Sequence, residues 1–282
     1  ARAVLVKTDS WRTHTGLSLW TQRALTLLAR PTPALRPNDE LLVLMGLLRA
    51  LDFADDYRDA APKASALAAR LLARLDAPKP EDQVNLRLLA SATILEHAGS
   101  MGHAELFEQA VDAVARDLGD TTISPWVLGL WLVAFGSVSG RYFPYGRRGF
   151  PFADAEAALR AAIAIGETES LPAVEFGALY HLQYQMKLAN NRGELATLIG
   201  RLGEVADSRH TTQVAVLADC QAALHTLRGD AGQALAACAR FMAAIEAADE
   251  PPIERWPHFI TQFQAMLAAR TAAEAAAYLA GL

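Results

Sequence analysis

Residues 211–249, TTQVAVLADCQAALHTLRGDAGQALAACARFMAAIEAAD, have the pattern of two helices joined by a tight turn. In the second half, residues at steps of four, three, four and three line one helix face; they are Ala234, Cys238, Phe241, Ile245 and Ala248. The matching stripe of the first half is Val214, Leu217 or Ala218, Gln221 and Leu224. Gly229 stands where a chain leaving a helix needs a positive φ, and Asp230 can cap the helix that follows.

Neither helix of this unit can bury its apolar face alone, so the unit needs neighbours. Similar patterns predict helix pairs along most of the chain, with corners near residues 57, 102, 152, 193, 230 and 270. A repeat of roughly 40 residues with two helices per unit is typical of α-solenoids. The alternative is a generic bundle of helices of similar length.

The boundaries of the other helices follow from breaks in the pattern. Asn38 or Asp39 is predicted to cap a helix that runs to Leu51, and Ser124 to cap one that begins at Pro125 and ends near 136–140. Further helices are predicted at 17–29, 63–75, 81–97, 105–118, 153–166, 172–188, 194–206, 253–269 and 271–279. Residues 1–15 are expected to be an N-terminal extension, and residues 16–282 one helical-repeat domain with an inserted loop at 139–152.

The composition favours an all-α protein. Hydrophobic residues make up 52% of the chain and charged residues 20%, which excludes a disordered chain. Alanine and leucine dominate the hydrophobic share, and both are strong helix formers. The net charge of −5 gives no electrostatic reason to expect direct nucleic-acid binding. No apolar run of about 18 residues occurs, so we expect no membrane span and a cytoplasmic location.

Nothing in the sequence indicates an oxidising compartment. The two cysteines, Cys220 and Cys238, are expected to be buried thiols, with a disulfide across the helix pair as the alternative. The first residues are too short and too mixed for a secretory signal. The chain begins with Ala1 rather than Met, which favours a fragment or a trimmed chain.

The corners and breaks of the pattern resemble those of tetratricopeptide-type repeats. A glycine followed by an acidic or polar residue opens the second helix at Gly102-His103, Gly193-Glu194 and Gly229-Asp230. A proline follows three of the second helices: Pro78, Pro172 and Pro251. A small residue, Ala234, lies five positions after Gly229. The repeat is longer than the standard length of about 34 residues, and His225 stands where the family usually has Tyr.

The longer, Ala/Leu-rich helices are similar to the central repeat domains of bacterial signal-transduction ATPases and of maltose-activator-type transcription regulators. The resemblance implies a right-handed α-solenoid of about five to six antiparallel helix pairs. It further implies a non-catalytic protein–protein interaction or ligand-sensing module of such a regulator, which binds a peptide, a partner protein or a small anionic ligand without a cofactor. A homodimer would be compatible with such a module. The ATPase motif G-x-x-x-x-G-K-[ST] does not occur in this sequence.

The irregular stretch RYFPYGRRGFP at residues 141–151 is the strongest candidate for a binding surface. Long loops in compact helical proteins are usually functional or mobile, and arginines beside aromatic rings suit recognition of an anion or a carboxylate. The predicted binding residues are Arg141, Tyr142, Phe143, Tyr145, Arg147, Arg148 and Phe150. The alternative is that the aromatic side chains pack the loop onto the helices and the arginines are solvated.

In tetratricopeptide-like superhelices, the first helix of each pair lines the concave face. The resemblance therefore adds candidate groove residues: Trp126, Trp131, Tyr180, His181, Tyr184 and Asn190. Aromatic and amide side chains suit a peptide or a small ligand. Large residues at helical spacing are more often core, so only a minority of this set is expected to face a groove.

Residues 55–59, with the sequence DDYRD, resemble the D-D-x-x-D motif by which all-α isoprenoid synthases hold Mg²⁺ on a substrate diphosphate. The alternative function is therefore a Mg-dependent enzyme that acts on an isoprenoid diphosphate through Asp55, Asp56 and Asp59. The second acidic motif of those enzymes does not occur, and the stretch lies at a predicted corner, where acidic residues favour the start of a helix. Neither an enzyme nor a metal site is predicted, because the histidines show no H-E-x-x-H spacing and no C-x-x-C occurs.

Calorimetry distinguishes these two functions. We expect no saturable heat when Mg²⁺ and a diphosphate analogue are titrated together into the protein, because the paired acidic motif is missing. Saturable heat that disappears in the variant Asp55→Asn would instead favour the enzyme.

Overall fold

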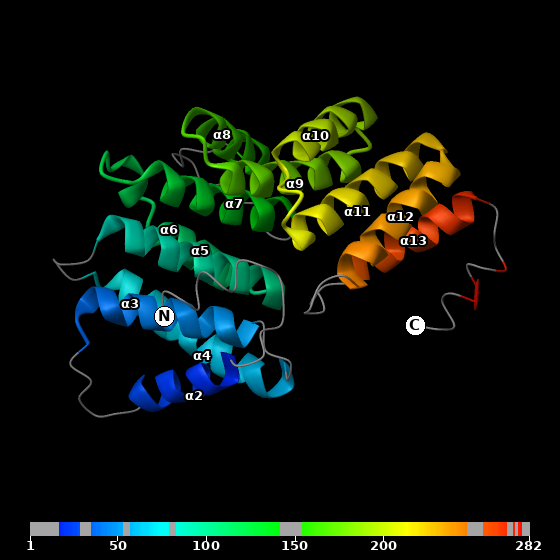
Figure 1. The fold of residues 1–282 in the computed structure, drawn as a ribbon. Helices are drawn as coiled ribbons and strands as arrows, with labels where there is room; N and C mark the ends of the chain where they lie inside the picture. The colour runs from blue at the N-terminus through cyan, green and yellow to red at the C-terminus, as the bar shows by residue number, and fades with distance from the viewer. Residues whose placement is uncertain are drawn as a thin grey trace. The chain divides into compact units, whose positions relative to one another are not determined.

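The computed structural model describes residues 17–28, 35–52, 57–78, 83–141, 154–246 and 256–269, together with residues 273, 276 and 277. All regular secondary structure in these ranges is helical (Figure 1). The predicted all-α class is confirmed for this part of the chain. No helix in it is both long and apolar enough to span a bilayer.

In chain order the α-helices are α2 (Leu17–Leu28), α3 (Pro37–Asp52), α4 (Tyr57–Asp76), α5 (Val84–Met101), α6 (Ala104–Asp112), α7 (Pro125–Arg141), α8 (Ala155–Thr168), α9 (Pro172–Leu188), α10 (Arg192–Val205), α11 (Thr211–Arg228), α12 (Ala231–Glu246) and α13 (Trp256–Ala268). A short 3-10 helix, η1 (Asp117–Gly119), follows α6. The helices predicted at 17–29, 172–188 and 194–206 agree with α2, α9 and α10 to within about two residues, the usual uncertainty of helix ends.

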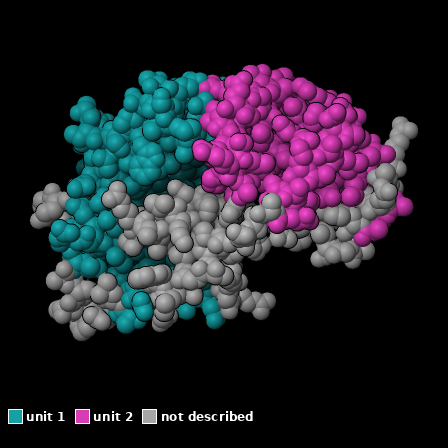
Figure 2. Space-filling view, in the orientation of Figure 1, with its two compact units in different colours: residues 1–181 teal, residues 182–282 magenta. Residues whose placement is uncertain are grey.

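The chain divides into two compact units, residues 1–181 and residues 182–282, with the division inside α9 (Figure 2). In the first unit, sequence neighbours from α2 to α6 pack against one another, and α7 packs against α8. Alternate helices also make contact there, because α5 packs against both α3 and α7. In the second unit, α10 to α13 pack in succession, and α11 also contacts α13. The helices therefore pack mainly with sequential neighbours, and a second set of contacts joins alternate helices.

Four helices end with the same backbone geometry. A residue with positive φ follows each of them: Gly102 (72°), Ser170 (55°), Asn190 (54°) and Gly229 (79°). The next residue donates its backbone N–H to a carbonyl oxygen near the helix end, as in His103 to Ala98 at 2.9 Å, Leu171 to Gly166 at 2.7 Å, Asn191 to Met186 at 2.9 Å and Asp230 to His225 at 2.9 Å. This is the Schellman pattern, which satisfies carbonyl groups left unpaired at a helix C-terminus.

Two of these corners carry the glycine that the sequence predicts, namely Gly102 and Gly229. The corner predicted near residue 193 is present between α9 and α10, but Gly193 itself lies in the first turn of α10. Asn190 supplies the left-handed residue instead. Asparagine tolerates this conformation better than most residues, since its short polar side chain forms local hydrogen bonds.

Two predicted helix caps are confirmed. Ser124 Oγ accepts a hydrogen bond from the N–H of Val127 at 3.3 Å, which caps α7. Asp230 Oδ1 accepts one from the N–H of Gln233 at 3.2 Å, which caps α12. In each case the side-chain oxygen satisfies an N–H that has no partner within the helix.

The predicted cap at Asn38 or Asp39 is wrong. α3 begins at Pro37, so both residues lie within its first turn. Asn38 Oδ1 instead accepts from the backbone N–H of Gln83 at 3.2 Å, and Asp39 accepts from Arg36 Nε at 2.7 Å. Proline is favoured at the first helical position, which explains the earlier start.

Two other boundaries differ from the prediction. α4 begins at Tyr57 rather than Lys63 and carries Pro62 in its second turn, where the missing N–H removes one hydrogen bond. Asp59 lies in the first turn of α4, where a carboxylate is favourable beside the positive end of the helix dipole. α6 is shorter than predicted and ends at Asp112.

Glycines inside α7 mark close helix packing, and α7 ends at Arg141, within one residue of the end that the sequence predicts near 136–140. A Cβ on Gly136 would lie 2.6 Å from Leu159 Cγ and 3.0 Å from the carbonyl oxygen of Ala155, both on α8. A Cβ on Gly129 would lie 2.5 Å from Val174 on α9, and one on Gly166 of α8 would lie 2.9 Å from the backbone nitrogen of Glu175. These three positions therefore have no room for a side chain.

Residues 211–249 correspond to α11 and α12. The stripe predicted on α12 faces inward: Ala234, Cys238 and Phe241 are buried, Ile245 is half-buried, and Ala248 lies outside the described residues. Cys220 and Cys238 are both buried and free, which confirms the prediction of two thiols. Burial raises the pKa of the Cys238 thiol to about 11, and the charge of Asp219 adds to this, so the thiol is protonated at neutral pH.

α11 buries more than the single stripe that the sequence predicts. Its buried residues are Ala215, Val216, Ala218, Cys220, Ala222, Ala223 and Leu224. They cover more than one face because α11 packs against α10, α12 and α13. Gln221 is half-buried, like Val214 and Leu217 of the same predicted stripe, and its Oε1 accepts from Arg240 Nη2 at 3.0 Å.

Alanine substitution tests the close packing at α7. Gly136→Ala should lower the free energy of unfolding by about 1–3 kcal/mol, because the added methyl group meets both a side chain and a backbone oxygen. The matched control is Gly200→Ala in α10, where nothing lies within 4 Å of the added Cβ. The free energy of unfolding of that variant should rise by about 0.5–1 kcal/mol, because alanine has a higher helix propensity than glycine. Urea unfolding measures the free energy of unfolding of both variants, and shifts of the same sign and size would contradict the close approach of α7 and α8.

Candidate functional site

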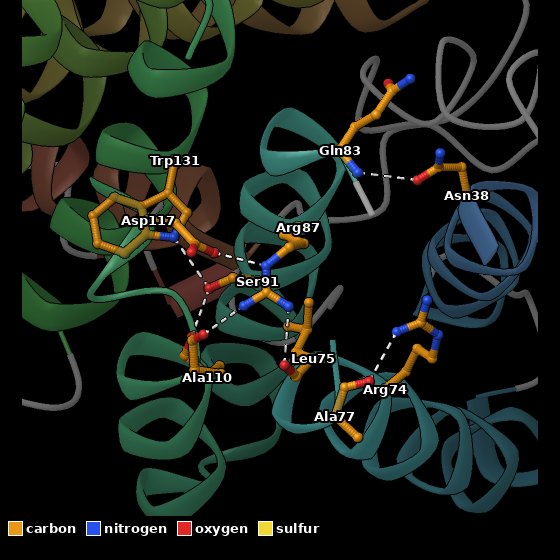
Figure 3. Close-up of polar contacts among 11 residues, drawn as sticks. Asn38, Arg74, Leu75, Ala77, Gln83, Arg87, Ser91, Ala110, Asp117 and Trp131 are labelled. Carbon is orange, nitrogen blue, oxygen red and sulfur yellow. Dashed lines mark hydrogen bonds and ion pairs between the residues drawn. The ribbon is translucent and has the colours of Figure 1, made fainter. Parts of the chain in front are cut away.

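Three groups of buried or half-buried polar side chains lie in the first unit, and they differ in what they can do. The first surrounds the buried guanidinium of Arg87 on α5 (Figure 3). Arg87 donates to Asp117 Oδ2 at 2.7 Å, to the carbonyl oxygen of Leu75 at 3.0 Å and to that of Ala113 at 2.9 Å. Leu75 lies in the last turn of α4 and Ala113 directly follows α6, so a cation meets the negative ends of two helices.

Ser91 extends this group towards α7. Its Oγ donates to the carbonyl oxygen of Ala110 at 2.7 Å and accepts from Trp131 Nε1 at 3.1 Å (Figure 3). The side chain of Trp131 is fully buried, and its ring stacks on Phe135 with centroids 5.4 Å apart. Trp131, a candidate groove residue, is therefore a core residue in this structure. This agrees with the expectation that large residues at helical spacing are more often core.

The second group joins the end of α3 to α5. His97 is fully buried, and its Nδ1 lies 2.7 Å from Asp52 Oδ1. Arg49 and Glu96 form an ion pair beside it. His97 Nε2 is also buried and has no hydrogen-bond partner among the described residues. The sequence analysis missed this pair, because its two members are far apart in the chain and match no motif.

The third group brings together three residues that the sequence predicts for binding. Arg141 lies in the last turn of α7, where its charge is favourable at the negative end of the helix dipole. Its Nη2 lies 3.1 Å from His181 Nδ1, and its Cζ lies 5.7 Å from the centroid of the Tyr180 ring. The rings of Tyr180 and His181, both on α9, have centroids 4.9 Å apart. We call these three residues the Arg141 cluster.

The Arg141 cluster combines a cation with a neutral imidazole. Burial lowers the pKa of His181 well below its usual range, and the charge of Arg141 lowers it further. His181 is therefore neutral at pH 7. An arginine N–H can only donate, so Nδ1 of His181 accepts and the ring proton lies on Nε2. The imidazole orients the guanidinium without neutralising it.

Of the remaining predicted binding residues, Trp126, Tyr184 and Asn190 lie in the described ranges. Trp126, near the start of α7, is 44% exposed. Tyr184 is half-buried on α9. Asn190 is the residue with positive φ after α9, and its Oδ1 accepts from Arg192 Nε at 3.2 Å. Tyr142, Phe143, Tyr145, Arg147, Arg148 and Phe150 lie outside the described residues, as do Asp55 and Asp56.

Asp59, the third member of the acidic motif, is exposed in the first turn of α4. Across the described ranges, no group of three or more His, Cys, Asp or Glu side chains is arranged so that it could hold a metal ion. No protein-family model, curated protein or solved structure matches the chain. In the described ranges the regular structure is all helical, and the helices pack mainly with sequential neighbours.

The depressed pKa of His181 predicts loss of stability in acid. The unfolded chain binds a proton at His181 near pH 6.5, whereas the folded chain does so only at lower pH. Stability contributed by the neutral ring is therefore lost as pH falls through about 6.5, by at most about 1.4 kcal/mol per pH unit. His181→Asn keeps an acceptor for Arg141 but does not titrate. Urea unfolding at pH 7.5 and 5.0 should show that the variant loses less stability at pH 5.0 than the wild-type protein. An equal loss of stability in the two proteins would contradict this.

Proposed function

We propose that the chain is a non-catalytic helical-repeat module that binds a protein or peptide partner or a small anionic ligand. We propose further that its helix pairs form a right-handed α-solenoid of about five to six units, as one domain over residues 16–282 with an inserted loop at 139–152. The resemblance to maltose-activator-type regulators makes a cytoplasmic bacterial signalling or transcription regulator the proposed setting.

The contact between alternate helices is the observation that carries this proposal. In a solenoid each helix pair stacks on the next, so first helices contact first helices. The contacts of α5 with α3 and α7 in one unit, and of α11 with α13 in the other, are of this kind. A bundle around one central core does not require such an alternation. Stacked pairs also present an extended surface, which repeat proteins use for binding.

The Arg141 cluster supports an anionic ligand. A guanidinium is permanently charged, and its planar fork fits carboxylate and phosphate groups. His181 and Tyr180 hold Arg141 in place, and a side chain that is ordered before binding loses less conformational entropy on binding. Arg147 and Arg148 follow shortly in the sequence and add positive charge to this part of the chain. An acidic or phosphorylated peptide is the partner that these residues favour.

Anionic peptides test the proposal. Fluorescence anisotropy with a labelled oligoglutamate peptide and with a labelled phosphoserine peptide should detect binding that weakens as salt is added. Arg141→Gln should weaken the affinity at least about tenfold, or about 1.4 kcal/mol. Arg160→Gln is the matched control, because Arg160 lies at the surface of α8 and pairs with Glu156 at 2.7 Å.

The double variant Arg147→Ala/Arg148→Ala should also lose binding, while its helical circular dichroism and melting stay almost unchanged. Equal affinities of Arg141→Gln and Arg160→Gln would remove Arg141 from the binding surface. Failure of the wild-type protein to bind either peptide would contradict an anionic partner.

A further inference from the structure

We propose that the binding surface extends from Arg141 along α7 to Trp126, so that an anionic peptide is held at two points. An acidic or phosphorylated residue of the peptide lies against Arg141, and an apolar side chain about six residues away lies on Trp126. The inference rests on the proposed function, because it adds a second contact to the same site and a fixed spacing between the two contacts.

α7 and residues 172–181 of α9 lie side by side in the first unit and run in the same direction. Near the middle of α7, a Cβ on Gly129 would lie 2.5 Å from Val174 Cγ1 on α9. At the end of α7, Nη2 of Arg141 lies 3.1 Å from Nδ1 of His181. The partners on α9 therefore advance along the chain together with those on α7. The two helices together form the floor on which a ligand of Arg141 would lie.

One side of α7 stays partly exposed beside this contact. Trp126, Leu130 and Val133 follow one another at steps of four and three, so they share a helix face. Trp126 is 44% exposed, and the other two are half-buried. A Cβ on Gly177 of α9 would lie 3.4 Å from Val133 Cγ1, so this face borders α9. Arg141 continues the face about two turns after Val133. We call Trp126, Leu130, Val133 and Arg141 the α7 strip.

The α7 strip is charged at one end and aromatic at the other. Arg141 is the only charged residue of α7. Glu175, the one charged residue among 172–181 of α9, lies against α8, because a Cβ on Gly166 would lie 2.7 Å from its Cβ. Tryptophan and arginine are the residues that most often dominate the free energy of binding at interfaces. A ligand that complements this strip is anionic at one end and apolar at the other.

The length of α7 sets the spacing between the two contacts. An α-helix rises about 1.5 Å per residue, so the Cα atoms of Trp126 and Arg141 are about 22 Å apart. An extended peptide advances about 3.4 Å per residue, so the same distance corresponds to about six or seven residues. A peptide whose two groups are much closer together reaches one end of the strip but not both.

A series of labelled peptides tests this spacing by fluorescence anisotropy. Each Gly/Ser peptide carries one phosphoserine and one phenylalanine, separated by about one or by about six residues, in both chain orders; a reference peptide carries phosphoserine alone. At the long separation, the tighter of the two chain orders should bind at least about fivefold more tightly than the reference, because the ring is partly buried on Trp126. At the short separation, the affinity should equal that of the reference.

Three variants assign the two contacts. Trp126→Ala should reduce the affinity for the long-separation peptide to that for the reference, and leave the affinity for the reference unchanged. Arg141→Gln should weaken the binding of both peptides. Leu267→Ala is the matched control, because Leu267 is an exposed apolar residue (48%) of α13 in the second unit. It should leave both affinities unchanged.

The outcomes separate this inference from the proposed function. If the reference binds through Arg141 but phenylalanine adds nothing at the long separation, the second contact is wrong and the anion site remains. An equal gain at both separations, or a gain that Trp126→Ala preserves, would also overturn the second contact. If no peptide binds, or if Arg141→Gln has no effect, the anion site is wrong, and the second contact with it. If Trp126→Ala does not fold, the two separations in the wild-type protein decide the outcome.

Discussion

The charge of Arg87 lies inside the first unit, and several segments of the chain are arranged around it. A buried cation is costly unless its N–H groups are satisfied. The guanidinium meets this condition by bonding to the end of α4, to the end of α6 and to Asp117 of η1. These three segments therefore hold fixed positions relative to α5. Ser91 and Trp131 extend the same constraint to α7.

The helices themselves could be predicted well from the sequence, because their apolar residues recur with a period of 3.6. The corner at Gly229 could be predicted too, since glycine is the residue that adopts a positive φ most easily. The packing role of Gly136 could not be predicted in this way. Glycine serves both where the backbone turns and where another helix comes close, and one sequence does not separate the two uses. The residue with positive φ at the corner before α10, Asn190, could not be predicted because asparagine is a weaker signal than glycine.

The candidate site could be predicted only in part. Arg141, Tyr180 and His181 were chosen on separate grounds, and their convergence depends on how the end of α7 lies beside α9. The neutral state of His181 results from burial, which residue identity does not reveal. The pair Asp52–His97 and the partners of Arg87 arise from contacts between different helices, 12 to 45 residues apart in the chain. Patterns of local spacing, however long, carry no information about such contacts.

The close contacts at Gly129, Gly136 and Gly166 also have a mechanical consequence. Helices that leave no room for a Cβ pack closely, and packed atoms resist compression steeply because repulsion rises sharply below the optimal separation. α7, α8 and residues 172–181 of α9 should therefore respond to a force as one stiff block. Arg141, at the end of α7, would move together with this block. A force applied at Arg141 would be transmitted along α7 to its opposite end with little deformation of the helix.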